Sequence, residues 1–211
     1  MKKSIALAIL VLPFLSCSST RFIDSWKSDE IGSFTPDKLL VVGMTENLTA
    51  RRIFEENLKL EFKARGINAY ESSGVLDQSF TETRRTEEEI EAMSADLLAK
   101  GFDAVIISAV IGVDEKTNYS PGYYDVGYRW YRFGRYYYRY QDIYYNPGYY
   151  DDYRVYHVET SIYNLRAEAA KALVWVGTFD IVDPHGIRGT VEGYVGRIVK
   201  QLESEQLISR P

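Results

Sequence analysis

The residues of this chain that could perform chemistry gather in two places in its second half. His157 and Glu159 alternate along an extended stretch, and Asp180, Asp183 and His185 surround a predicted turn. Imidazole and carboxylate groups bind zinc, but a site needs at least three such ligands in one place. The chain has 2 histidines and 1 cysteine in all. We therefore expect no metal and no other cofactor, and we interpret the first pair as a solvated strand face and the second group as a helix-capping turn.

Two neighbouring arginines form a second candidate site. Arg51 and Arg52 fall in the first turn of a predicted helix, where each positive charge opposes the helix dipole by about 0.3–1 kcal/mol. Either Glu55 and Glu56, one turn later, or an external anion would compensate this cost. Gly43 precedes the helix without the other glycines of a phosphate-binding loop, so we expect no nucleotide site.

Nothing in the chain favours catalysis. No serine, histidine and aspartate have the spacing of a catalytic triad. The acidic run Glu87–Glu89, with Glu91, opens a predicted helix and is interpreted as a solvated helix end rather than an acid/base pair. We expect the protein not to be an enzyme.

The most unusual stretch is Asn118–Tyr156, whose 39 residues hold 15 of the 18 tyrosines. We call it the Tyr-rich insertion. The sequence PGYYD occurs in it twice, at 121–125 and 147–151, and arginines recur every three or four residues between the copies. Tyrosine rings stack on sugars, on other rings and on guanidinium groups. The candidate binding residues are Tyr123, Tyr124, Tyr128, Trp130, Tyr131, Tyr136, Tyr137, Tyr138, Tyr144, Tyr145, Tyr149 and Tyr150.

Three interpretations of the Tyr-rich insertion stay open. It is a self-stacking or partly disordered hairpin without a ligand, a binding arm for a glycan or a protein, or a surface that lies against a membrane, where tyrosine is common. Single-stranded nucleic acid is the other usual partner of interleaved tyrosine and arginine. The acidic balance of the chain, with a formal net charge of −5, argues against nucleic acid.

The N-terminus has the features of a secretory leader. A basic start precedes an apolar run over residues 5–12, which is too short to span a bilayer. Residues 14–17, FLSC, resemble the lipobox of bacterial lipoproteins, in which the cysteine is acylated and becomes the mature N-terminus. Phe14 stands where that motif usually has leucine. We expect a lipoprotein signal peptide over 1–17 and acyl chains such as palmitate on Cys17, the alternative being an ordinary signal peptide with an incidental cysteine.

The predicted anchor fixes the expected compartment. Multiple acyl chains hold a protein firmly on a membrane, because each buried methylene contributes about 0.8 kcal/mol. Ser18, rather than aspartate, follows the cysteine, and by resemblance to enterobacterial sorting rules this favours the outer membrane, facing the periplasm. Cleavage would also remove two lysines and take the formal charge from −5 to −7.

The first half of the chain predicts a parallel β-α-β-α-β core. Strands are expected over 38–43, 67–70 and 102–113. Two amphipathic helices connect them, and each ends in a basic residue followed by glycine. Asn47 or Thr49 caps the first helix, and Thr86 with Glu89 forms a capping box for the second. The buried positions are predicted to be Ile53, Phe54, Leu58, Phe62, Ile90, Met93, Leu97 and Leu98.

The second half predicts an antiparallel hairpin and a last helix. Residues 155–165 and 171–182 alternate in polarity like half-buried strands. One face of the hairpin is expected to carry Tyr156, Val158, Thr160 and Ile162 on the first strand and Leu173, Trp175, Phe179 and Ile181 on the second. A helix over 190–205 has the apolar stripe Val191, Val195, Ile198 and Leu202, and we expect Gly193 and Gly196 to let it approach the sheet closely.

Together these elements predict one mixed α/β domain over 38–208, with the Tyr-rich insertion between its central strand and its hairpin. Residues 18–37 are expected to form a tether that docks on the domain through Phe22, Ile23 and Trp26. The domain should not depend on the insertion for its fold.

The segments KLLVVGMTENLTARRIFEENL, KARGINAYESS and LVWVGTFDIVDP, with the closing amphipathic helix, resemble a group of uncharacterised bacterial envelope lipoproteins. Members of that group commonly carry a Tyr/Gly-rich insert at this position. The order of strands and helices is also similar to that of the TolB N-terminal domain. The resemblance implies a fold and a compartment, but no activity.

We therefore expect a non-enzymatic envelope lipoprotein that displays the Tyr-rich insertion to a glycan, such as peptidoglycan, or to an envelope protein. The alternative is an assembly component of the outer membrane that acts through its α/β body, with the insertion dispensable.

Overall fold

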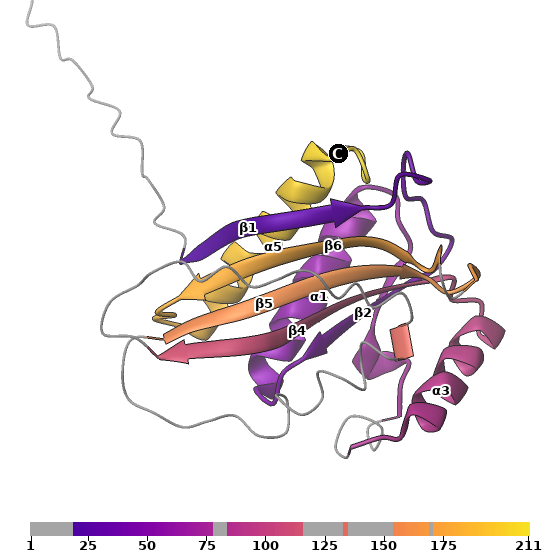
Figure 1. Cartoon of the computed structure of the whole chain (residues 1–211), viewed down its shortest axis with the longest axis horizontal. Helices are drawn as coiled ribbons and strands as arrows, with labels where there is room; N and C mark the ends of the chain where they lie inside the picture. The colour runs from indigo at the N-terminus through magenta and orange to yellow at the C-terminus, as the bar shows by residue number, and fades with distance from the viewer. Residues whose placement is uncertain (1–18, 78–83, 116–132, 135–153, 169–170) are drawn as a thin grey trace, which may run out of the picture.

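The computed structural model of the chain describes residues 19–77, 84–115, 133–134, 154–168 and 171–211. In this part of the chain one six-stranded mixed sheet has the strand order β1-β6-β5-β4-β2-β3, with helices on both faces (Figure 1). The predicted α/β class with a mixed sheet is confirmed.

The parallel half of the sheet is the predicted β-α-β-α-β unit. It consists of β2 (Leu39–Met44), α1 (Leu48–Ala64), β3 (Ala69–Glu71), α3 (Glu87–Ala99) and β4 (Ala104–Glu115). Strand β2 pairs in parallel with β3 on one side and with β4 on the other. A helix links each strand to the next, as parallel pairing requires.

Local sequence signals fix the ends of both helices. The side chain of Asn47, not Thr49, caps α1 by accepting a hydrogen bond from the Ala50 amide at 3.0 Å. After this helix Gly66 takes a φ of +78°, a conformation that glycine adopts readily. Thr86 and Glu89 form the predicted capping box of α3. On that helix Leu98 is 39% exposed, so its predicted burial is wrong.

The antiparallel half continues from β4 through the predicted hairpin of β5 (Arg154–Asn164) and β6 (Leu173–Val182). A strand that the sequence did not predict, β1 (Thr20–Lys27), pairs with β6 and forms the edge of the sheet. The docking segment around Trp26 is therefore a strand rather than a tether.

A β-bulge in β6 corrects one predicted face of the hairpin. Ile162 pairs with Trp175, but Tyr163 pairs with Leu173, so Val174 is an extra residue in β6. A bulge reverses the alternation of side chains on one side of it. Leu173 consequently packs with Tyr163 on the opposite face from Trp175.

The last helix, α5 (Ile187–Ser204), buries Val195, Ile198 and Leu202 as predicted. An added Cβ on Gly196 would meet no atom within 4 Å. The prediction that this glycine allows a close approach to the sheet is therefore wrong.

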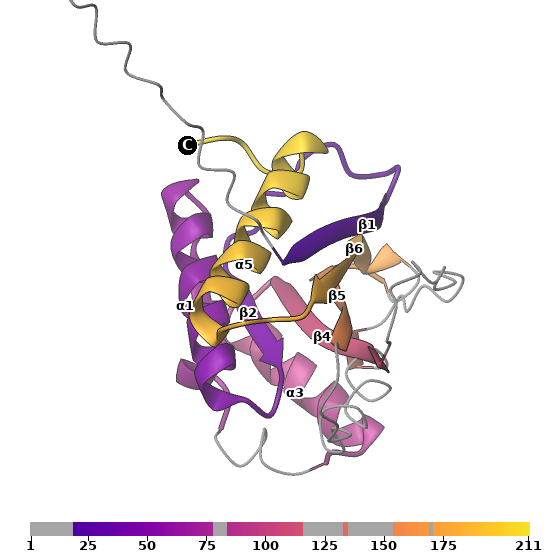
Figure 2. The ribbon, with the colours of Figure 1, turned by 90° about the vertical axis from the view of Figure 1, so that its left-hand side faces the viewer.

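Two apolar clusters hold the helices on the sheet. On one face α1 and α5 lie side by side, as Figure 2 shows, over Val41, Ile106, Ile162 and Trp175. On the other face α3 packs against a second cluster that includes Leu40, Val105 and Tyr163. Within the described ranges, no helix is long and apolar enough to cross a membrane.

Candidate functional site

The residues predicted to carry function lie outside the described part of the chain. This holds for the proposed lipid attachment at Cys17 and for all twelve candidate binding residues of the Tyr-rich insertion. The structure does describe where the insertion leaves the sheet, where it returns, and two residues in its middle, Phe133 and Gly134.

The middle of the insertion is attached to the domain. Phe133 is 4% exposed and belongs to the cluster beneath α3. Its ring packs edge-on against Tyr163 of β5, with the ring centroids 6.0 Å apart. A Cβ on Gly134 would lie 3.5 Å from Ile90 on α3. Phe133 is therefore a core residue, and removal of the whole insertion would remove part of the core.

The strands on both sides of the insertion are held in the β4–β5 ladder, and residues 154–156 of the predicted insertion belong to β5 itself. Glu115 pairs with Arg154 at the last position of this ladder. The Arg154 carbonyl also accepts a hydrogen bond from the Asp183 amide at 2.8 Å, and the Val182 amide donates to the Ser19 carbonyl at 2.9 Å. The N-terminal chain, the insertion and the connection from β6 to α5 thus leave the sheet at the same end.

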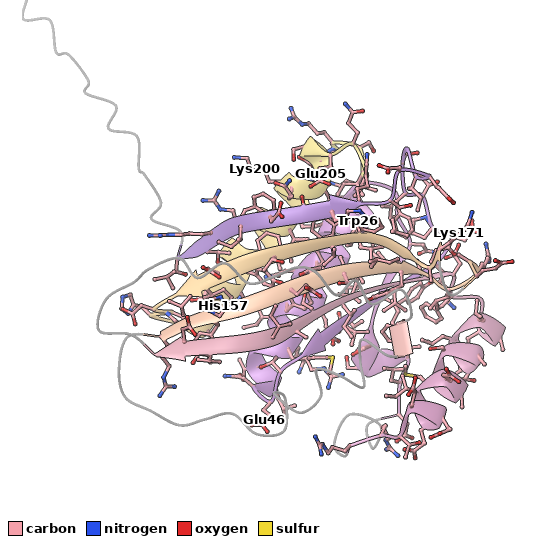
Figure 3. The ribbon with its side chains drawn as sticks, viewed as in Figure 1. Trp26, Glu46, His157, Lys171, Lys200 and Glu205 are labelled. Atoms are coloured by element: carbon pink, nitrogen blue, oxygen red, sulfur yellow. The ribbon has the colours of Figure 1, made fainter. Side chains whose placement is uncertain are left out.

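A buried polar group, here called the His157 cluster, lies near this end of the sheet (Figure 3). His157 Nδ1 is 2.7 Å from an Asp180 oxygen, and its Nε2 is 3.5 Å from an Asp114 oxygen. His157 is 2% exposed and Asp180 is 4% exposed. The predicted solvated strand face is therefore wrong for His157, which instead links β4, β5 and β6.

The described residues hold no group of three or more histidine, cysteine, aspartate or glutamate side chains that could bind a metal. His157 and Glu159 are neighbours on β5, but the partners of His157 are the two aspartates. His185 lies 3.4 Å from Asp183 in an exposed turn, with 87% of its side chain accessible.

The Arg51 site is occupied by the chain itself. Arg51 Nε donates to Glu55 Oε1 at 3.0 Å, and its Nη2 donates to Ser72 Oγ at 2.7 Å. The same Glu55 oxygen accepts from the Gly43 amide at 3.0 Å and from Ser72 Oγ at 2.6 Å. Of the two alternatives for Arg51, Glu55 rather than an external anion compensates the charge. Arg52, by contrast, is exposed.

This network fills the carboxyl end of β2, where ligands bind in many parallel sheets. Glu55 is 1% exposed and Ser72 is 0% exposed. Gly43 lets the helix approach closely here, because a Cβ on it would lie 3.1 Å from the Phe54 ring and 3.4 Å from the Arg51 side chain. The arrangement is structural, since the carboxylate holds the first turn of α1 to β2 and to Ser72.

A second buried hydroxyl group joins α5 to the sheet and was not predicted. Tyr194 lies 2.5 Å from Thr160 Oγ1, which lies 2.6 Å from Ser108 Oγ. Burial raises the pKa of the Tyr194 hydroxyl far above its usual range. The hydroxyl therefore stays protonated and acts as a structural donor.

No family model matches the chain, and no curated protein matches its sequence. Solved structures with a partial likeness include the PelC dodecamer from Paraburkholderia phytofirmans, at 13% identity and a TM-score of 0.43, covering 90% of this chain and 99% of that one. The lipoprotein GNA1162 from Neisseria meningitidis aligns at 14% identity and a TM-score of 0.41, covering 80% of this chain and 99% of that one. These likenesses are too distant to assign the chain to a family or an activity.

Proposed function

We propose that the protein is a non-enzymatic lipoprotein of the bacterial cell envelope, anchored through acyl chains on Cys17 and presenting the Tyr-rich insertion to a glycan or protein partner. We place it on the outer membrane, facing the periplasm, because Ser18 follows the cysteine. The leader and the lipobox-like FLSC sequence support the anchor.

The observation that carries the binding role is the way in which the fold holds the insertion. The strands that flank it are paired at Glu115 and Arg154, and Phe133 is buried between α3 and β5. Between these three attachment points lie two segments of similar length, 116–132 and 135–153, and each contains one copy of PGYYD. Anchored aromatic residues bind at a low entropy cost, since fewer torsions are fixed on binding.

The buried polar groups described above argue against an enzymatic alternative at their positions. Glu55 bonds to Ser72, and Thr160 bonds to Tyr194, and all four side chains are almost fully covered. A reacting group must be able to reach its substrate. We therefore propose that the insertion, not the core of the domain, is the functional surface.

Trp130→Ala is expected to weaken partner binding by about 2 kcal/mol, because tryptophan has the largest ring face and is enriched among binding hot spots. Tyr131→Phe, which keeps the ring, should weaken binding less. Sedimentation with purified peptidoglycan and pull-down from envelope extract measure the effect. Binding should survive moderate salt, since stacking is screened less than ion pairing.

The matched control replaces residues 116–132 and 135–153 by Gly/Ser linkers and keeps Phe133 and Gly134, so that the core retains its buried ring. This variant should fold and lose capture. Equal capture by wild type, Trp130→Ala and the linker variant would reject the binding insertion and favour a partner that contacts the α/β body.

Cys17→Ala is expected to abolish acyl labelling and to move the protein from the membrane to the soluble fraction. Metabolic labelling with a tagged fatty acid and fractionation of the envelope measure both effects. Ser16→Ala serves as a control that keeps the cysteine and a small residue before it. A Cys17→Ala protein that stays on the membrane without label would show that another surface provides the anchor.

A further inference from the structure

Three exposed apolar side chains lie at one end of the fold, on three different elements: α1, β4 and α5. Leu48 is 71% exposed, Ile187 is 43% exposed and Val113 is 42% exposed. Ile23, Leu60 and Leu98 are exposed to a similar degree, at 44%, 53% and 39%, but lie farther along β1, α1 and α3. We call Leu48, Val113 and Ile187 the seating face.

The sheet register places Val113 at the same level along the sheet as the start of the N-terminal strand β1. Thr20 pairs with Ile181, Ile181 with Tyr156, and Tyr156 with Val113, so these residues form one row across four strands. Ile187 starts α5 just beyond the end of β6. Figure 1 shows β1 beginning and β4 ending at this same end of the sheet.

Leu48 belongs to the same end because β2 and β4 run in parallel. Met44, the last residue of β2, pairs with Ala109 at the middle of β4, and α1 begins four residues later at Leu48. In Figure 3 the labelled Glu46, next to this helix start, and His157 lie toward this end, whereas Lys171 lies at the opposite one.

The distance from the proposed lipid to the fold is short. Cys17 precedes Thr20 by three residues, which span about 10 Å when fully extended. Thr20 is itself 1% exposed and starts β1. An acylated Cys17 would therefore hold this end of the sheet within about 10 Å of the lipid headgroups.

We propose that the seating face rests on the lipid surface that holds the acyl chains of Cys17, an inference that depends on the lipid anchor proposed above. Exposed apolar side chains held this close to a membrane lose contact with water when they enter the interface. Charges of both signs flank them, with 75% of the Arg188 side chain and 50% of the Glu192 side chain accessible. The chain as a whole is acidic, and anionic headgroups attract basic rather than acidic segments. The proposed contact of the seating face with lipid is therefore apolar and does not require anionic lipid.

This orientation also determines where the Tyr-rich insertion is presented. The residues Glu115 and Arg154, which flank it in β4 and β5, lie at the same end of the sheet as Val113. A partner of the insertion would therefore bind close to the membrane surface, a region in which tyrosine side chains are common.

Depth-dependent fluorescence quenching tests the proposal on the full processed lipoprotein. Single cysteines are introduced as Leu48→Cys, Val113→Cys or Ile187→Cys, and as Leu60→Cys or Leu98→Cys for matched controls, and each is labelled with an environment-sensitive fluorophore. Cys17 is the only native cysteine, and its lipid blocks its sulfur. The control at Leu60 lies about 18 Å along α1 from Leu48. All five side chains are exposed, so the label does not disturb the core.

In vesicles of phosphatidylethanolamine and phosphatidylglycerol that contain a nitroxide-bearing lipid, we expect at least twofold stronger quenching at the three seating positions than at the two controls. Equal quenching at all five positions, or stronger quenching at the controls, would overturn the seating face. Acyl labelling and vesicle flotation of the same samples separate the two proposals. Protein that is acylated and floats with the vesicles but shows no selective quenching would overturn only the seating face. Wild-type protein without acyl label would overturn both the anchor and the seating face.

Discussion

Trp175→Ala is expected to lower the free energy of unfolding by about 3–5 kcal/mol, the range for removal of a fully buried tryptophan. Trp175 is 0% exposed in the cluster beneath α1 and α5. Its indole Nε1 also donates to Glu205 Oε2 at 3.0 Å. The other oxygen of that carboxylate accepts from Ser25 Oγ at 2.5 Å and from Gln201 Nε2 at 2.6 Å. Denaturant unfolding of wild type and variant measures the difference.

A double-mutant cycle with Gly177 tests whether the position of the indole causes this effect. A Cβ on Gly177 would lie 2.3 Å from Cη2 of Trp175 and 2.6 Å from its Cζ2. Gly177→Ala should therefore destabilise the wild type but be tolerated in Trp175→Ala, giving strongly non-additive effects. Gly196→Ala is the control, because the added methyl meets open space on a helix and should stabilise the protein by up to about 1 kcal/mol. Additive effects of Gly177→Ala and Trp175→Ala would contradict this packing.

The elements predicted correctly are those whose signals are local. The caps at Asn47 and Thr86 depend on residues three positions away. The apolar stripes of α1, α3 and α5 repeat within single helices, and the alternation in β5 is visible within one strand. The parallel pairing of β2 with β3 and β4 follows from the helices between them.

The errors arise where contacts join distant parts of the chain. The 8 residues of strand β1 show no regular apolar alternation, and only its pairing with β6, 148 to 161 residues later, makes it a strand. Leu173 changes face because Val174 is accommodated as a bulge opposite β5, which no periodicity in β6 alone indicates. The exposed Leu98 directly follows the fully buried Leu97, and one step along a helix turns its side chain by about 100° away from the covered face.

The polar sites show the same division. Glu55 lies one helical turn after Arg51, so their pairing was among the predicted alternatives. Ser72, which completes the network, lies 21 residues after Arg51 and has no sequence signal. His157 was expected in solvent because its partner Asp180 is 23 residues away on another strand. Two carboxylates that both interact with one ring could be recognised only from the sheet register.

Glu55→Ala is expected to destabilise the protein by about 3–5 kcal/mol, the cost of leaving a buried charge without its partner. Glu55 is 1% exposed, and Arg51 opposite it is 8% exposed. The substitution would also remove the acceptor of the Gly43 amide and of Ser72 Oγ. Since these bonds join α1, β2 and the turn at Ser72, the loss should extend to the whole fold, and a single cooperative transition at lower denaturant concentration is the expected observation.

Glu56→Ala is the matched control, because Glu56 is the next residue on the same helix but is exposed, and its loss should change the free energy of unfolding by less than about 0.5 kcal/mol. The double variant Arg51→Met with Glu55→Leu removes both charges and keeps apolar volume. This double variant should recover much of the free energy of unfolding lost in Glu55→Ala, because one buried charge without its partner destabilises the fold more than replacement of both charges by apolar side chains. If Glu55→Ala were as mild as Glu56→Ala, the network would not be holding α1 to β2. Arg51 would then be satisfied by another partner, and the external anion considered from the sequence would become the alternative to test.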